Sequence, residues 1–196
     1  MKGLSFCGLT VGLAGVMVAM VSSAEPVRYV FDSSHTFPSF EADHFGGMSI
    51  WRGKINHTEG EAVLDREAGT GTIDVVMDMT TIDFGHERMN QEAYDKILHV
   101  TEFPKATYQG RMIDFENGAP TRVEGTLTIH GVSKPVELEI TSFICKPHWS
   151  TKIERCGAGA TAMINRADFG LTRDLNLGFF PEVKLLISVE GVRQED

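Results

Sequence analysis

The sequence predicts an all-β protein with one domain, built as an antiparallel barrel or sandwich. Apolar and polar residues alternate with a period of two through most of the chain after residue 25, which is typical of strands with one buried face. Short turn-forming segments separate these runs and favour hairpin connections. The chain has 196 residues, a length that suits a single barrel or sandwich domain.

The first 24 residues have the parts of an export signal. A short basic start, MK, precedes residues 4–20, which are almost all apolar or glycine, and the small residues of VSSA follow. We therefore expect a signal peptide over residues 1–24 and a single mature domain over residues 25–196.

The exported chain is expected to be soluble and to have no stable membrane anchor. Cys7 lies near the beginning of the apolar run, whereas a lipoprotein signal needs its cysteine at the end. No later run approaches the roughly 18 apolar residues that span a bilayer. Without residues 1–24, 27 acidic side chains stand against 17 basic ones, a formal charge of −10. This charge repels phosphate backbones, so nucleic acid is not expected as a partner.

The alternating pattern predicts eight or nine strands, most of them in hairpin order. In TIDVVMDM, residues 72–79, Ile73, Val75, Met77 and Met79 share one parity, and the two aspartates share the other. The clearest hairpin joins VEGTLTIH (123–130) to VELEI (136–140) through GVSKP (131–135), which reads as a turn. The remaining strands are expected at residues 27–32, 39–44, 51–64, 106–115, 158–164 and 183–189.

Residues 86–98 are the exception to the two-residue period. Met89, Ala93 and Ile97 recur at helical spacing, accompanied by Tyr94 and Leu98. This segment predicts one short amphipathic helix that closes an end of the barrel or covers its flank.

Two groups of charged residues outside the strands have structural explanations. Asp83, His86 and Glu87 lie where the helix begins, and carboxylates there are favoured by the helix dipole, so capping is expected rather than a metal or acid–base cluster. Arg166 and Asp168 are expected to form an ion pair at the barrel rim, with contact to a charged head group as the alternative. No motif of a nucleophile elbow, phosphate-binding loop or zinc protease is present. No catalytic residue, cofactor or metal is therefore predicted.

The stretch HTFPSFEADHF, residues 35–45, reads as one wall of the barrel. The side chains of Glu41 and Asp43 share the parity that faces solvent. Successive side chains of a strand point to opposite faces, so the other parity faces the interior of a closed barrel. The residues on that parity are Phe40, Ala42 and His44.

His44 would be a polar group in an apolar interior. It can hydrogen-bond either a ligand's head group or a neighbouring side chain, and a protein partner is favoured because buried polar groups usually have one. His35 lies nine residues earlier, an odd offset that places it on the other face unless a bulge near Pro38 intervenes. A metal site shared by the two histidines is therefore not expected.

The interior residues can either fill a small core or surround a ligand, since an eight-stranded barrel is just wide enough for both. Small residues at inward positions favour unfilled space, and Met77 and Met79 suit an adaptable wall. The small residues are Ala42, Gly125, Ala158, Ala160 and Ala162. The residues expected to line the cavity are Phe40, Ala42, His44, Ile73, Val75, Met77, Leu127, Ile129, Leu138 and Ile140.

Cys145 and Cys156 are the two cysteines of the mature chain. In an oxidising compartment such a pair is more often a disulfide than two free thiols. A disulfide closing so short a loop would stabilise the fold by roughly 2–3 kcal/mol in the chain-entropy model. The alternative is a metal site with His148, which lacks a clear fourth ligand.

Four segments resemble, in order, the landmarks of the YceI-like family. They are YVFDSSHTFPSFEADHFGG from residue 29, EFPKATY at 102–108, VEGTLTIHGVSKPVELEI at 123–140 and NRADFGL at 165–171. Each motif is weak alone, but the four are in register over most of the mature chain. The chain departs from the family pattern in HTF after Asp32 and in the extra glycine of HFGG, which bears on the identity of the ligand.

The resemblance implies an extended, lipocalin-like, eight-stranded antiparallel barrel. The implied function is that of a non-enzymatic periplasmic carrier or scavenger of an amphiphile with an isoprenoid or fatty tail. The pair Cys145 and Cys156 resembles a subgroup of the family with a disulfide there. Two alternatives stay open: an enzyme that acts on such a lipid, and a stress-related structural barrel without a ligand. The oligomeric state also stays open, with a homodimer as one alternative.

Overall fold

The structure, a computed structural model, describes residues 25–195, and the expected signal peptide lies outside the described residues. The strands are β1 (Val27–Phe31), β2 (Phe37–His44), β3 (Ser49–Ile55), β4 (Thr58–Asp65), β5 (Thr70–Asp78), β6 (Ile82–Asp83), β7 (Lys105–Glu116), β8 (Ala119–Ile129), β9 (Val132–Pro147), β10 (Glu154–Asn165) and β11 (Glu182–Arg193). The helical segments are η1 (Met79–Thr81), α1 (Glu87–Glu92), η2 (Ala93–Ile97), η3 (Arg166–Phe169) and η4 (Leu175–Leu177).

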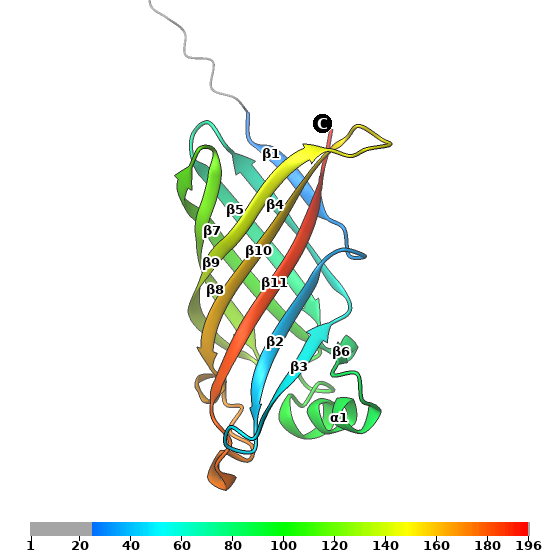
Figure 1. Cartoon of the computed structure of the whole chain (residues 1–196), viewed down its shortest axis with the longest axis vertical. Coiled ribbons are helices and arrows are strands. Elements are labelled where there is room, and N and C mark those ends of the chain that lie inside the picture. Colours follow the sequence, from blue (N-terminus) through cyan, green and yellow to red (C-terminus); the bar gives the residue numbers. More distant parts are fainter. Residues whose placement is uncertain (1–24, 196) are drawn as a thin grey trace, which may run out of the picture.

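Eight strands close into an antiparallel barrel in the order β1-β4-β5-β7-β8-β9-β10-β11. Pairing of β11 with β1, from Tyr29 opposite Arg193 to Phe31 opposite Gly191, completes the ring. Figure 1 shows the strongly tilted strands wound around a long barrel axis. The predicted all-β barrel with one short helix is confirmed, because the alternating pattern leaves each strand one apolar face to bury inside.

The strand β2 leaves the ring after the corner at residues 32–36 and joins β11 beside the lower part of the barrel. Its pairing runs from Phe37 opposite Ser188 to Ala42 opposite Val183. Next to it, β3 pairs with β2 and the short β6 pairs with β3. These strands and α1 lie at one end of the barrel, which we call the helix end, and Figure 1 shows it at the bottom. The opposite end, where Cys145 and Cys156 lie, is the cysteine end.

Three details of the secondary structure differ from the sequence expectation. The segment 51–64 is not one strand, because the chain turns at Asn56 and His57 between β3 and β4. The turn expected at 131–135 is shorter, since His130 and Gly131 adopt positive φ angles of 53° and 72° and β9 begins directly after them. The helix predicted at 86–98 is α1 followed by the π-helical turn η2. No helix within residues 25–195 is long and apolar enough to cross a bilayer.

A small core cluster fills the cysteine end of the barrel. Tyr29, Leu64 and Cys156 are buried there, and Phe115 and Phe143 pack against them. The Tyr29 hydroxyl donates a hydrogen bond of 2.6 Å to Glu154. Burial, followed by this contact, raises the pKa of Tyr29 to about 12, so the hydroxyl stays protonated near neutral pH. The cysteine end of the barrel interior is therefore filled by packed side chains.

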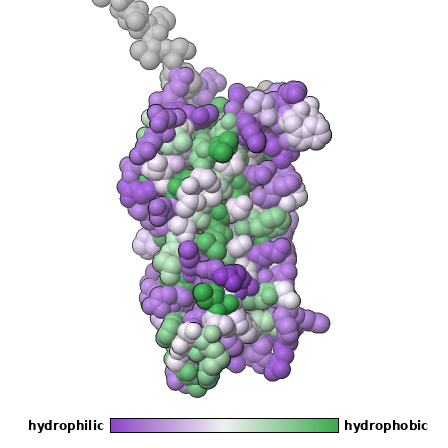
Figure 2. Space-filling view, in the orientation of Figure 1, coloured by the Kyte–Doolittle hydropathy of each residue, from purple (hydrophilic) through white to green (hydrophobic). Residues whose placement is uncertain are grey.

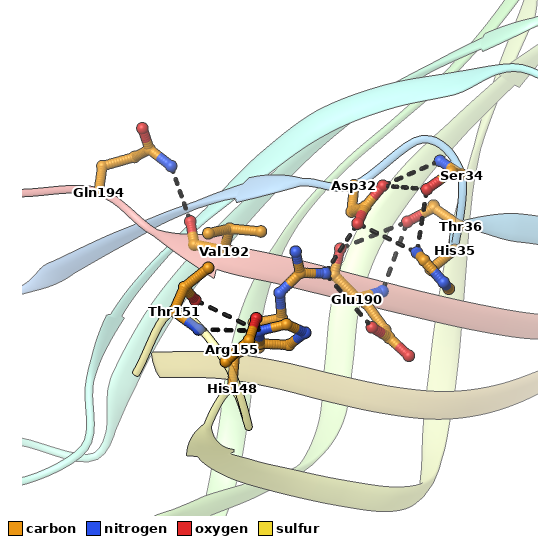
Figure 3. Close-up of polar contacts among 11 residues, drawn as sticks. Asp32, Ser34, His35, Thr36, His148, Thr151, Arg155, Glu190, Val192 and Gln194 are labelled. Atoms are coloured by element: carbon orange, nitrogen blue, oxygen red, sulfur yellow. Dashed lines mark hydrogen bonds and ion pairs between the residues drawn. The ribbon is translucent and has the colours of Figure 1, made fainter. Parts of the chain in front are cut away.

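A polar cluster fixes the corner between β1 and β2, as Figure 3 shows. The Asp32 carboxylate accepts hydrogen bonds from the Ser34 hydroxyl at 2.5 Å and from Arg155 Nη1 at 2.8 Å, and it lies 3.0 Å from His35 Nδ1. The Ser34 hydroxyl, then Arg155 and His35, hold the pKa of Asp32 well below its usual range, against the opposing effect of partial burial. The cluster ties the corner to β10 and so fixes where β2 begins.

Candidate ligand cavity

A cavity of about 390 Å³ occupies the barrel interior between the Tyr29 cluster and the helix end. Its wall is overwhelmingly apolar and comes from the inner faces of the barrel strands, from β2 and from α1. Its charged lining residues, which belong to the helix end, are Asp43, Glu92, Arg166, Arg173 and Asp174. Since the side chains of Glu92, Arg173 and Asp174 are one-third or more exposed, the cavity meets solvent there.

Nine of the ten residues expected to line a cavity lie on its wall. Whether they contact a ligand stays a prediction. They are Phe40, Ala42, His44, Ile73, Val75, Met77, Leu127, Ile129 and Leu138. The tenth, Ile140, packs against the main core cluster instead. It lies farther along β9 toward the cysteine end, where it pairs with Ala160 beside an irregularity in the register of β10.

Sequence reasoning missed several aromatic side chains of the wall. Tyr108 follows the inward parity of β7 and could have been found by extending the same pattern to residues 106–115. Trp51 comes from β3, whereas Phe84 and Phe179 come from connecting segments, to which a period of two does not apply. The sequence carries no simple signal for these last two.

The small residue Gly125 does not leave the empty space that was expected of it. A β-carbon at this position would lie 2.4 Å from the ring of Tyr108, so the tyrosine occupies the room that the glycine provides. The Tyr108 hydroxyl donates to the carbonyls of Val123 and Val136, at 3.2 and 2.9 Å. Burial raises the pKa of Tyr108, which keeps this buried donor protonated. Gly125 therefore makes room for the Tyr108 ring in the cavity wall and does not enlarge the cavity.

His44 lies at the cavity edge and is held by aromatic neighbours. Its ring stacks on Trp51 with centroids 4.2 Å apart and an interplanar angle of 10°. Phe179 meets it edge-on at 5.8 Å, and the Ser49 hydroxyl lies 3.4 Å from its Nδ1. The imidazole therefore has protein partners. His35, by contrast, is exposed and lies beside Asp32, so it does not form a shared metal site with His44.

The two carboxylates expected to be solvated differ from one another. Glu41 lies outside the cavity wall and pairs with Arg52 at 2.7 Å, and its side chain is 22% exposed, so it is only partly solvated. Asp43 is half-buried and accepts the backbone N–H groups of Gly46, Gly47 and Phe180 at 2.8, 2.5 and 2.9 Å. Desolvation opposes ionisation of Asp43, but these hydrogen bonds prevail and lower its pKa. The expectation for Asp43 is wrong because the loop after β2 folds back over its carboxylate.

The ion pair expected between Arg166 and Asp168 does not form in the described structure. Two residues apart on the short η3 turn, the side chains leave in different directions. The guanidinium of Arg166 instead donates to the carbonyls of Leu171 and Arg173 at 2.8 and 2.9 Å. Burial lowers the pKa of Arg166, while Asp174 and Asp43 act in the opposite direction. Arg166 thus lies on the cavity wall, and Asp168 does not.

Asp83, His86 and Glu87 do not form a shared metal or acid–base site. The helix begins after His86 without a side-chain cap, and Asp83 instead accepts hydrogen bonds from Gly85 and Asn90, so the expected capping is wrong in detail. Within residues 25–195, no group of three or more His, Cys, Asp or Glu side chains is arranged to hold a metal ion.

Cys145 and Cys156 face each other across β9 and β10, with their sulfur atoms 2.01 Å apart. This arrangement fits the expected disulfide. Formation of the bond in the exported protein stays a prediction.

These features define a closed antiparallel barrel with an apolar cavity open at one end. The YceI-like domain matches residues 29–191, and the chain belongs to this family. A UPF0312 protein of Yersinia enterocolitica is 32% identical over 192 residues, covering 95% of each chain. One of Pectobacterium carotovorum is 31% identical over 183 residues, covering 91% of this chain and 93% of that one.

Solved structures with the same fold are distant in sequence. A polyisoprenoid binding domain from Saccharophagus degradans, implicated in plant cell wall breakdown, aligns with a TM-score of 0.61 at 16% identity, covering 85% of this chain and 98% of that one. BcnA of Burkholderia cenocepacia gives 0.62 at 15% identity, with 82% and 98% covered. The YCEI protein of Campylobacter jejuni gives 0.62 at 21% identity, with 76% and 88% covered.

Proposed function

We propose that the protein binds an amphiphilic lipid with an isoprenoid or fatty tail, holds the tail in the barrel cavity and acts as a carrier or scavenger. The observation that carries this proposal is the apolar cavity of about 390 Å³ with charged residues at its open end. Its volume is within the range of roughly 300–1,000 Å³ that is usual for small-molecule sites. The relation to a polyisoprenoid binding domain from another organism supports the same class of ligand.

The proposed orientation of the ligand follows from where polar groups lie. The tail contacts the apolar wall, including Ile73, Val75 and Leu127, because burial of apolar surface is the favourable term there. The polar end is proposed to lie near His44 and Arg166, at the end of the cavity where Glu92, Arg173 and Asp174 meet solvent. A head group inside the barrel would lose its hydration where the wall offers few polar partners, chiefly Thr36 and Thr58, and this costs free energy.

The proposed location is the periplasm, after removal of residues 1–24, with residues 25–196 as the working domain. Cell fractionation and the mass of the exported protein test this part. A protein retained in the cytoplasm at its full mass would contradict it.

The function is tested by purifying the exported protein without detergent and analysing its organic extract by mass spectrometry. A single lipid at about one molecule per protein is the expected result. A substrate and product pair would instead indicate an enzyme acting on the lipid. The absence of any lipid, together with failure to take up added geranylgeraniol or palmitate, would indicate a barrel without a ligand.

A further inference from the structure

Two neighbouring segments at the helix end carry a patch of exposed apolar side chains that the cavity does not use. The segments are residues 45–50, FGGMSI, and residues 175–181, LNLGFFP, which together we call the tip. Neither contains a charged residue, although 23% of the chain is charged. The exposed large apolar residues of the tip are Phe45, Met48, Ile50, Leu177 and Phe180. Figure 2 shows apolar surface gathered at this lower end. Such patches on a globular protein usually mark an interaction surface.

The two segments are fixed to one another and present a single surface. The backbone N–H of Phe180 donates to Asp43 at 2.9 Å, and the rings of Phe45 and Phe179 meet edge-on at 5.8 Å. Gly46 has φ of 65°, and a β-carbon there would lie 2.9 Å from the carbonyl oxygen of Gly178. The close approach of the two segments therefore depends on a glycine at position 46, and specific contacts hold the tip in this arrangement.

The tip is continuous with the opening of the cavity. His44 and Trp51, which flank the first segment, line the cavity, and so does Phe179, the neighbour of exposed Phe180. We propose that the tip docks reversibly on a zwitterionic phospholipid surface, so that the cavity opens against the layer that supplies or receives the lipid. This inference rests on the proposed function for its purpose, whereas docking itself can be measured separately.

Charge and composition favour a neutral lipid surface as the partner. The chain carries a net charge of −9, which an anionic surface would repel. Three arginines near the tip are engaged: Arg52 pairs with Glu41, Arg173 lies within 4 Å of Glu92 and Asp174, and the Arg166 guanidinium donates to backbone carbonyls, including that of Phe180. Aromatic and aliphatic side chains on an uncharged loop are suited to the boundary between head groups and acyl chains.

The test is flotation of the exported, processed protein with phosphatidylcholine vesicles, with and without a fraction of anionic phosphatidylglycerol. The tip variant is Met48→Glu with Leu177→Glu, at side chains that are 72% and 61% exposed and outside the cavity wall. The matched control is Ile144→Glu with Trp149→Glu at the cysteine end, where the side chains are 63% and 82% exposed. Uptake of geranylgeraniol added from ethanol is measured for all three proteins.

We expect the native protein and the control to float with neutral vesicles and the tip variant to lose at least about tenfold in bound fraction, since buried carboxylates disfavour the interface. Geranylgeraniol uptake should be equal in all three, and anionic lipid should not increase binding. If native protein fails to float, or if both variants lose equally, docking at the tip is overturned. A native dimer that the tip variant converts to a monomer, with unchanged flotation, would assign the tip to self-association and also overturn it. Tip-dependent flotation without geranylgeraniol uptake would retain docking and reject the proposed function.

Discussion

Replacement of Leu127 by tryptophan should block the cavity. Leu127 is 4% exposed on β8 and lies on the cavity wall. An indole adds about six non-hydrogen atoms to the space that a tail would fill. At about 0.8 kcal/mol for each buried methylene, excluding some five carbons of a slim tail costs about 4 kcal/mol, roughly a thousandfold in affinity. Overpacking should also destabilise the fold by about 1–3 kcal/mol, which lowers Tm by roughly 2–12 °C.

The assay is titration of delipidated protein with geranylgeraniol and with palmitate, followed by native mass spectrometry and by thermal unfolding. The matched control is Ile140→Trp, on the inner face of the neighbouring strand but outside the cavity wall. It should lose comparable stability and keep the native affinity. A folded Leu127→Trp protein that still binds either probe with native affinity would refute the assignment of the cavity. Equal loss of binding in both variants would mean that general disorder of the interior, and not blockage, is responsible.

Three further predictions concern the head-group end, the cysteines and the corner at Asp32. His44→Ala should weaken binding of the alcohol geranylgeraniol about threefold to tenfold, because one hydrogen bond of about 0.5–1.5 kcal/mol is lost. It should leave binding of a hydrocarbon probe unchanged, and Glu41→Gln should change the binding of neither probe. Equal effects of the two substitutions would contradict the orientation of β2. Cys145 and Cys156 should give no titratable thiol in denatured, unreduced protein from the periplasm, and two thiols would disprove the bond. Because the folded-state pKa of Asp32 lies below its unfolded value, its carboxylate stabilises the fold at neutral pH and loses that effect progressively below about pH 4. Asp32→Asn should therefore lower Tm at pH 7, with a difference that narrows toward pH 3; a constant difference would contradict a role for ionisation.

The parity of apolar side chains predicted the barrel wall well where a strand is long and its pairing regular. Met77 on β5 and Leu127 on β8 lie inside because each shares its parity with other buried apolar side chains of its strand, Val75 and Val123 respectively. The break at Asn56 was missed because the polar run at residues 56–61, which contains the turn, was read as part of one continuous strand. Parity also could not show that Ile140 lies beyond the cavity, because depth along the barrel depends on the stagger of strands and not on the face that a residue occupies.

The candidate site was harder to predict than the wall, because it depends on contacts between residues far apart in the chain. Phe179 reaches His44 only because Asp43 binds the backbone of Phe180 and draws the two loops together. Neither segment has a periodic pattern that signals this contact. Gly125 illustrates the related difficulty within a strand: the missing side chain could leave a void or admit a ring, and Tyr108 on the adjacent strand decides between them.

The two ends of the barrel together favour one orientation for an amphiphile. At the cysteine end, Tyr29 and Leu64 belong to a packed cluster, so a tail that enters the cavity is expected to stop before it. At the helix end, His44 and Arg166 line the cavity, and both carry N–H groups that can donate hydrogen bonds to a polar group. A tail-first ligand buries apolar surface along the wall and keeps its head group hydrated, whereas the reverse orientation would bury the head among mostly apolar side chains that offer few hydrogen bonds. The cavity opens at the helix end, beside the apolar tip. With the tip docked on a membrane, a lipid tail would pass from the bilayer into the cavity with the least exposure to water.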